Sequence, residues 1–362
     1  MRLISTNHVI PKSILGKTIY NERNKVLLNE GVVLSESLVT RLIELGVLYV
    51  YIEDPKSENI NPENTVSERL RFEAIESIES IFLESDKKGT QAAKSYIFEK
   101  NSKQLMGLIR GIMKEMTAEK GLLTILADVY THDSYIFTHS YNVTLYALAI
   151  GMELKLNPKQ LEILGLGSIL HDVGKMKVSQ KILLKPGKLT EEEYEEIKTH
   201  AEEGFQILKE VNTVPLLVAH CAYQHHERID GSGYPRGLKD KDIHFFAKIL
   251  AVADVFDAVT SNRVYRKALL PHEGLEILYS GSGTLFDTEI IEAFRKAVAI
   301  YPIGLTVKLN DKRIGIVSKQ NHGISDRPVV RIIKDNGNHD VQPYEIDLMK
   351  CLDVMIVDCI TN

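Results

Sequence analysis

The chain has 362 residues, and at roughly 150 residues per domain this length predicts two or three structural units. Hydrophobic residues make up 44% of the chain and charged residues 26%, which excludes disordered, collagen-like and fibrous proteins. The net charge of -5 gives no reason to expect nucleic acid as the main partner, so we expect no nucleic-acid-binding function.

The first part of the chain, residues 1–60, is predicted to be a small α+β module. Short apolar alternations at 25–28 and 47–52 predict strands, and the segment between them predicts a helix that starts at Ser35 and stops at Gly46. A polar stretch with two prolines follows. Because proline interrupts both helices and strands, we expect a linker there.

The rest of the chain changes pattern twice. Residues 61–120 are predicted to be a helical connector, because apolar residues recur at helical spacing in them, and residues 121–300 continue this spacing as an all-helical domain. Residues 301–362 are predicted to be a small antiparallel β unit, because turn residues separate four short β-type segments: LTVKL, RIGIV, PVVRII and DVMIVDCI. The predicted fold class is therefore mainly α, with a helical bundle as its core.

The cysteines and the apolar runs bear on localisation. Cys221, Cys351 and Cys359 form no CxxC motif, which argues against a disulfide framework and a thiolate zinc site and favours a reducing compartment. No apolar run reaches the roughly 18 residues that a membrane-spanning helix needs, and the N-terminal segment lacks the apolar core of a signal peptide. We therefore expect a cytoplasmic protein without a membrane span.

Histidine is unevenly distributed, because nine of the twelve lie between residues 121 and 300. The most informative are His171 and the adjacent Asp172, which end an apolar segment and have Lys175 one turn further on. An imidazole and a carboxylate are costly to bury unless they are paired or bind a metal, so this pair favours metal ligation. His139, taken alone, is more typical of a hydrogen-bonded core histidine.

More polar residues interrupt the apolar pattern further along. His200 lies in a predicted helix with an acidic first turn, and His225 and His226 stand where a helix runs into a glycine-rich segment. Asp254 and Asp257 share one face of an otherwise apolar helix, so their carboxylates are expected to face a common space.

Together these residues predict a metal centre. Five histidines and two or three aspartates project from at least five predicted helices, and such ligands suit iron, manganese or zinc. One ion needs only three or four ligands, so the number predicts two ions with Asp172 as the bridge. Two ions about 3.5 to 4 Å apart are the recurring device of phosphate-ester hydrolysis, and hydrolysis of a phosphodiester is the reaction we expect.

The motifs that contain these histidines and aspartates, and their order along the chain, resemble those of the HD-GYP domain, a bacterial branch of the HD phosphohydrolases. The resemblance covers about residues 121–300 and implies an HD-type helical bundle with cyclic di-GMP phosphodiesterase activity and a binuclear iron or manganese centre. The motifs that support it are HDVGK (171–175), HHERIDGSGYP (225–235), KPGKLT (185–190), NRVYR (262–266) and GTLFD (283–287).

The resemblance also implies a role for each matching residue. Asp172 and Lys175 would be the catalytic residues, with Lys175 steadying the scissile phosphate. The first metal would be held by His139, His171, Asp172 and Asp254, and the second by Asp172, His200, His225 and His226. The substrate-binding residues would be Lys175, Tyr234, Arg263 and Arg266.

One position departs from the family pattern. Some members carry a glutamate one turn before the first histidine and bind a third metal, whereas this chain has Tyr135 there. Asp257, a candidate ligand for that third ion, is then expected only to form hydrogen bonds. We therefore expect two metals and linear pGpG as the product, with GMP as the alternative end product.

Two other functions stay open. One is an HD phosphohydrolase that acts on another cyclic dinucleotide or nucleotide, and the other is a cyclic di-GMP sensor without hydrolysis, for which a lost ligand would be expected and none is lost. We further expect protein partners at the GYP loop, the segment HHERIDGSGYP (225–235), and a homodimer through helices between 66 and 118. The histidines outside the motifs are expected at the surface or at helix ends: His8, His132, His220, His244, His272, His322 and His339.

Overall fold

The computed structural model describes residues 1–21, 25–62, 65–87, 91–118, 135–185, 187–261, 269–321 and 323–360, without the side chains of 84–87, 91–100 and 135. These residues form two compact units. The terminal unit contains the described parts of 1–65 and 295–362, and the helical unit contains those of 66–119 and 132–294.

The N-terminal part of the terminal unit is the predicted α+β module. Strand β1 (Arg2–Ser5) pairs antiparallel with β4 (Tyr49–Ile52), and β2 (Ile19–Tyr20) pairs with β3 (Val26–Leu28). Helix α1 (Glu36–Glu44) starts after Ser35, whose hydroxyl accepts a hydrogen bond from the Leu38 amide, and Gly46 follows its end with a φ of +81°. The predicted start and stop of this helix are confirmed.

The C-terminal part of the same unit is a five-stranded antiparallel sheet with the strand order β8-β7-β6-β5-β9. The sequence predicted four of these strands and missed β8, because this edge strand contains Pro343 and leaves most of its side chains exposed. The strands are β5 (Thr306–Leu309), β6 (Ile314–Lys319), β7 (Val329–Lys334), β8 (Asp340–Asp347) and β9 (Ile356–Ile360).

The two parts of the terminal unit share one core. Leu3 bridges Leu305, and the Arg2 side chain donates a hydrogen bond to the Thr306 hydroxyl at 2.8 Å. The expected linker also packs within this unit, because Ser57 and Ile60 are almost fully buried around the short 3-10 helix Pro55–Ser57. Both ends of the described chain therefore fold together, and the helical unit lies between them in the sequence.

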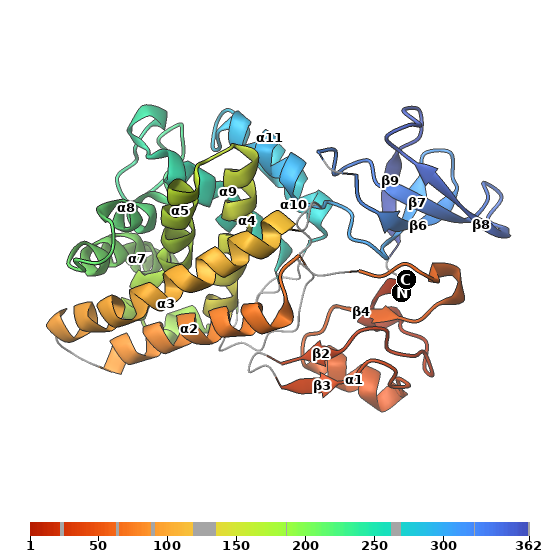
Figure 1. Ribbon diagram of the computed structural model, residues 1–362, viewed down its shortest axis with the longest axis horizontal. Helices are drawn as coiled ribbons and strands as arrows, with labels where there is room; N and C mark the ends of the chain where they lie inside the picture. The colour runs from red at the N-terminus through yellow and green to blue at the C-terminus, as the bar shows by residue number, and fades with distance from the viewer. Residues whose placement is uncertain are drawn as a thin grey trace. The chain divides into compact units, whose positions relative to one another are not determined.

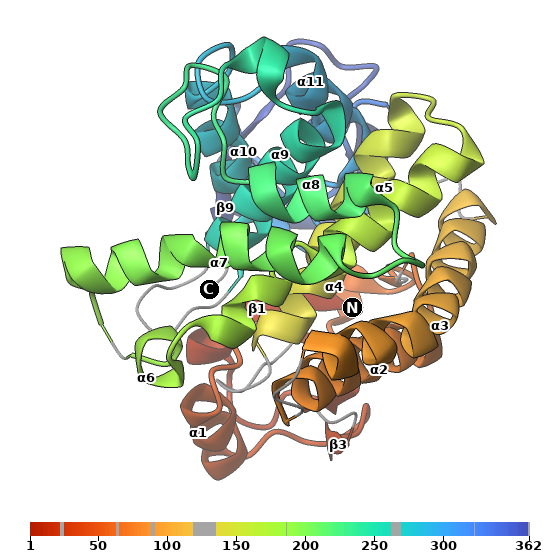
Figure 2. The ribbon, with the colours of Figure 1, turned by 90° about the vertical axis from the view of Figure 1, so that its left-hand side faces the viewer.

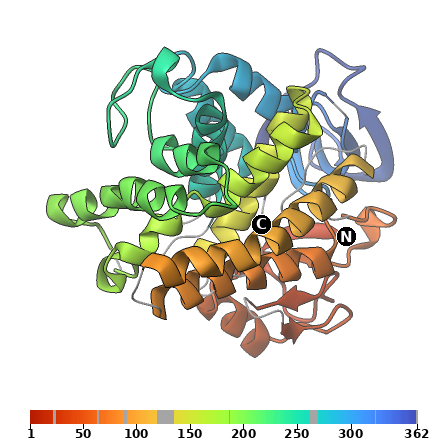
Figure 3. The same ribbon diagram turned by 60° about the vertical axis from the view of Figure 1, so that its left-hand side comes forward.

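The helical unit confirms a mainly α fold with a bundle core. The two predicted connector helices, α2 (Glu68–Lys87) and α3 (Gln91–Ala118), lie side by side and also contact α4 and α5 (Figures 1 and 3). Among the described residues, none of the helices has the length and apolar character to cross a bilayer. The other helices are α4 (Tyr135–Glu153), α5 (Pro158–Leu170), α6 (Gln180–Leu183), α7 (Glu191–Lys209), α8 (Leu216–Gln224), α9 (Phe245–Thr260), α10 (Pro271–Ser280) and α11 (Thr288–Ala297).

The central helices pack closely enough to bring their ends together. Helix α5 contacts α4 and α8, α7 contacts α8, and α9 contacts α4 and α8 (Figure 2). A side chain at Gly167 of α5 would come within 2.7 Å of the Cys221 sulfur of α8, so glycine allows the close approach of these two helices. A short 3-10 helix, η3 (Val173–Lys177), follows α5 and packs against α7.

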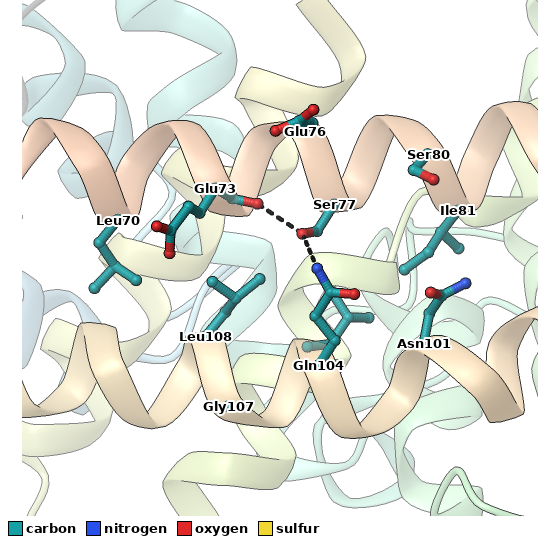
Figure 4. A pocket seen from close by; sticks show the side chains of 11 residues that line it. Leu70, Glu73, Glu76, Ser77, Ser80, Ile81, Asn101, Gln104, Gly107 and Leu108 are labelled. Carbon is teal, nitrogen blue, oxygen red and sulfur yellow. Dashed lines mark hydrogen bonds between the residues drawn. The ribbon is translucent and has the colours of Figure 1, made fainter.

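A groove of about 600 Å³ separates parts of α2 and α3 (Figure 4). Ser77 lies in it, accepts a hydrogen bond from the Gln104 amide at 2.9 Å and donates one to the Glu73 carbonyl at 2.6 Å. The described lining of this groove contains none of the predicted metal ligands, so the groove is separate from the candidate site.

Candidate metal centre

The fold brings all seven predicted metal ligands together. His139 comes from α4, His200 from α7 and Asp254 from α9, whereas the others stand where helices end. His171 follows α5 directly and is succeeded by Asp172, and His225 and His226 follow α8. All seven are buried except His226, whose side chain is 17% exposed.

The ligand atoms form overlapping groups that can hold a metal ion. One group is His139, His171 and Asp254, and another is His200, His225 and His226; a third joins His171, Asp172 and His225. Within each group the atoms lie within 4.8 Å of one another.

Asp172 lies between the first two groups. Its Oδ2 is 3.5 Å from Nε2 of His171 and 3.6 Å from Nε2 of His139. Its Oδ1 is 3.4 Å from Nε2 of His200 and 3.9 Å from Nε2 of His225. One oxygen therefore faces each group of histidines.

Backbone carbonyls set the orientation of three of the imidazoles. Nδ1 of His171 donates to the Ser168 carbonyl at 2.7 Å, Nδ1 of His200 to Ile197 at 2.6 Å, and Nδ1 of His225 to Ala222 at 2.9 Å. Because a carbonyl only accepts, Nδ1 carries the proton and each Nε2 presents a lone pair to the centre. This is the arrangement that metal-binding histidines usually have.

Several of these acceptors are unsatisfied. Nε2 of His171 and Oδ1 of Asp172 are buried and form no hydrogen bond with any described residue. Nε2 of His200 and Nε2 of His225 are 3.2 Å apart, although both would be acceptors in this tautomer. Leaving buried acceptors unpaired costs free energy, and a divalent cation would satisfy all of them. The donor set therefore fits divalent metal binding.

His139 is held in a different way. Its Nδ1 contacts Oδ2 of Asp257 at 2.6 Å, and its Nε2 contacts Oδ1 of Asp254 at 3.0 Å. The other oxygen of Asp257 accepts hydrogen bonds from Asn142 and Ser261, both at 2.9 Å. Sequence reasoning missed Asn142, although it lies one turn after His139 in an apolar helix, a spacing that places the two side chains on one face.

The pKa values follow from burial and from the neighbouring charges. Burial lowers the pKa of His200 to about 4 and also lowers the pKa values of His171, His225 and His226, so these four imidazoles are neutral near pH 7. Burial also acts on His139, but its contacts with Asp254 and Asp257 outweigh that effect and raise its pKa to about 9.

The two central carboxylates are ionised. Burial alone would raise their pKa values, but the ammonium group of Lys175, helped by the surrounding histidines, holds the pKa of Asp172 well below 3.8. The hydrogen bond from His139 does the same for Asp254. Nζ of Lys175 donates to Oδ2 of Asp172 at 2.5 Å.

Metal affinity is expected to rise with pH up to about 9, because the proton on Nε2 of His139 must leave before that atom binds an ion. We expect the metal affinity to increase about tenfold for each pH unit between pH 6.5, the usual pKa of histidine, and about pH 9. In the metal-free protein the raised pKa stabilises the fold fully below pH 6.5, and this contribution is lost as the pH rises through about 9.

Calorimetric titration with Mn²⁺ at several pH values in this window checks the prediction. The His220→Gln variant is the control, because that histidine packs on Phe205 outside the cluster. Its Mn²⁺ affinity should depend on pH in the same way as that of the unmodified protein. An affinity that does not change with pH would show that no proton competes with the metal.

The GYP loop is fixed beside the cluster. Glu227 is 2% exposed, and its carboxylate accepts hydrogen bonds from the amides of Arg236 and Leu238 at 2.9 and 2.8 Å. The Tyr234 ring stacks on His226 with a centroid distance of 4.5 Å, so the predicted substrate-binding tyrosine lies against a predicted ligand. Sequence reasoning missed Glu227, which looks like an ordinary charged residue within the motif.

Some of the predicted residues are not described by the structure. Arg263 and Arg266 fall outside the described residues, as do His132 and His322, and the side chain of Tyr135 is not described. Nδ1 of His244 accepts a hydrogen bond from the Phe246 amide at the start of α9, which confirms a helix-capping role for that histidine.

Comparison with known proteins matches two segments of the chain. Residues 120–290 match the model of a family described as HD domain, and residues 306–362, which include the five-stranded sheet, match one described as KOW domain associated with HD domain.

Curated relatives match part of this chain. A cyclic di-GMP phosphodiesterase of Pseudomonas aeruginosa is 38% identical over 218 residues, or 60% of this chain and 52% of that protein. A cyclic di-GMP phosphodiesterase of Thermotoga maritima is 35% identical over 232 residues, or 64% and 60%. A 3'3'-cGAMP-specific phosphodiesterase of Vibrio cholerae is 37% identical over 168 residues, or 46% and 36%. The chain thus spans about half to three fifths of the length of the first two.

Proposed function

Because residues 120–290 belong to the HD domain family, we propose that this chain is a metal-dependent phosphodiesterase that hydrolyses cyclic di-GMP. The observation that carries the proposal is the position of Asp172, whose two oxygens face two separate groups of imidazoles. This geometry suits a pair of ions, and paired ions are the recurring device for cleaving phosphate esters.

The proposed centre holds two ions of iron or manganese. When bound, such ions supply a hydroxide nucleophile at neutral pH and neutralise charge on the phosphate. One ion would be held by His139, His171, Asp172 and Asp254, and the other by Asp172, His200, His225 and His226.

The remaining work falls to cationic and aromatic side chains. Lys175 is 18% exposed at the edge of the cluster, and we propose that its ammonium group binds a phosphate oxygen and stabilises the charge that develops there. We keep Tyr234, Arg263 and Arg266 as proposed substrate-binding residues. Arginine offers a planar fork of donors that suits phosphate or a guanine edge.

A third ion has no obvious ligand among the described side chains. Asp257 uses both oxygens, one for His139 and one for Asn142 and Ser261, so we propose that it positions His139 rather than binding metal. This agrees with the presence of Tyr135 where some family members have glutamate. Two ions and linear pGpG as the main product follow from this proposal.

A second candidate substrate is 3'3'-cGAMP, because a relative at 37% identity is named as specific for it. A sensor without hydrolysis is less consistent with the described cluster, in which each predicted ligand is present and buried or partly buried. Cytoplasmic localisation, a homodimer through α2 and α3 and protein partners at the GYP loop stay predictions.

The test is metal analysis of anaerobically purified protein, with turnover assays on the same sample. We expect two ions per chain and faster hydrolysis of cyclic di-GMP than of 3'3'-cGAMP or cyclic di-AMP, with pGpG accumulating. Faster hydrolysis of 3'3'-cGAMP would favour the second candidate. A fully loaded protein that binds cyclic di-GMP without cleaving it would contradict the proposed activity.

A further inference from the structure

An aromatic and cationic surface lies beside the metal centre, on α7 and the GYP loop. It consists of Tyr194, Lys198 and Tyr234, and we call it the tyrosine–lysine rim. We propose that this rim is the subsite for a guanine base of the cyclic dinucleotide. The proposal rests on the proposed function only in placing the phosphate at the metal centre.

The rim is continuous with the proposed ligands. The Tyr234 ring stacks on His226 at 4.5 Å with an angle of 27° between the rings, and its centroid is 6.4 Å from that of His200. Nζ of Lys198 lies 5.7 Å from the Tyr234 ring and 4.8 Å from the Tyr194 ring. A path of close contacts therefore leads from the metal centre to the protein surface.

Two separate elements build this rim. A spacing of four residues on a helix explains why Lys198 meets Tyr194, but it does not explain the contact with Tyr234. That contact exists because Glu227 fixes the GYP loop by accepting two backbone hydrogen bonds. Lys198 is also held from its own helix, since Glu195 accepts its hydrogen bond at 2.5 Å.

The exposure of the rim suits a ligand surface. Tyr194 is 47% exposed, and the Lys198 side chain is 28% exposed. An exposed ring next to a phosphate-binding site offers a face on which a base can stack, and such stacking is a general device for binding nucleotides that are not paired.

The charge of the rim predicts which base it takes. Guanine presents two acceptors, O6 and N7, along one edge, whereas adenine presents N7 and an amino donor there. An ammonium group donates only, so Lys198 matches both guanine atoms and faces the adenine amino group unfavourably. Tyr194 would supply the stacking, and Lys198 the preference for guanine.

Binding measurements on the full, metal-loaded chain test the proposal. The ligands are hydrolysis-resistant bisphosphorothioate forms of cyclic di-GMP and cyclic di-AMP, and affinity is measured by isothermal titration calorimetry. Tyr194→Ala is expected to weaken binding of both ligands about 5- to 150-fold, because stacking does not depend strongly on the base. Lys198→Met is expected to weaken binding of the cyclic di-GMP analogue about tenfold and binding of the cyclic di-AMP analogue less than twofold.

Two matched variants serve as controls. Lys209→Met removes a lysine from the same helix that also lies over an aromatic ring, at 5.7 Å from that of Phe205. Tyr279→Ala removes a tyrosine of α10 that is 39% exposed. Both are expected to bind each ligand as the unmodified protein does, and thermal melts verify that all four variants are folded.

The possible outcomes separate this proposal from the proposed function. Affinities within twofold of the unmodified protein for both rim variants would overturn the subsite, as would an unmodified protein that binds neither ligand or prefers the adenine form. Turnover of cyclic di-GMP by the unmodified protein is measured on the same sample. Binding that depends on the rim, in a protein without turnover, would support the subsite and contradict the proposed activity.

Discussion

Replacement of Asp172 by asparagine is expected to reduce turnover of cyclic di-GMP by at least about 10³-fold and to lower the metal content below one ion per chain. The carboxylate is 1% exposed, and its two oxygens lie 3.4 to 3.9 Å from imidazole nitrogens of both groups. Asparagine keeps the shape but replaces one anionic oxygen by an amide that donates hydrogen bonds, so it binds cations poorly. Elemental analysis and chromatographic assay of pGpG measure both effects.

Two controls distinguish ligand loss from the loss of an ion pair. Lys175→Met removes the partner of Asp172 but leaves the ligand in place, so the metal content should stay unchanged while turnover falls about 100-fold. Asp240→Asn removes another lysine–aspartate pair, with Lys248, from a side chain that is 53% exposed, and it should change neither quantity. If Asp172→Asn kept two ions and full turnover, the proposed bridge would be wrong.

Several of the candidate metal ligands stand out in the sequence because they interrupt an apolar pattern. His171 and Asp172 follow a helix whose last seven residues are all buried, and Asp254 stands among buried apolar neighbours in α9. A polar side chain in such a position needs a partner, and the local pattern of apolar residues alone is enough to reveal this need. The convergence of these residues from separate helices depends on the tertiary fold, which no local pattern contains.

The supporting residues were harder to predict. Asn142, Ser261 and Glu227 act through hydrogen bonds to Asp257 or to backbone amides, and nothing in their spacing separates them from ordinary polar residues. A tertiary contact, rather than a local pattern, defines their roles.

The terminal unit also shows that local sequence patterns do not predict tertiary contacts. Leu3 and Leu305 lie in one core, although about three hundred residues separate them in the chain. The alternation around each residue predicts a strand, but it does not predict the partner, because pairing depends on which apolar faces remain uncovered after the rest has folded.

Gly174→Ala is expected to disrupt the proposed metal centre although it replaces none of the proposed ligands. A side chain at this position would place its first carbon 1.9 Å from the His200 carbonyl oxygen and 2.5 Å from the Gly204 amide nitrogen. Both are backbone atoms, so η3 and α7 would have to separate by about an ångström or more. Such overpacking is expected to lower the free energy of unfolding by about 3 kcal/mol and to move Asp172 away from His200.

Gly107→Ala supplies the matched control, because it makes the same change in α3 where nothing beyond the adjacent residues and the helix's own backbone lies within 4 Å of the added carbon. Alanine is the better helix former, so this variant is expected to be about 0.5 to 1 kcal/mol more stable than the unmodified protein. Chemical denaturation and Mn²⁺ titration of both variants measure the effects. A Gly174→Ala protein with unchanged stability and metal affinity would show that η3 does not pack against α7 in solution, and the close approach that brings Asp172 to His200 would then need another cause.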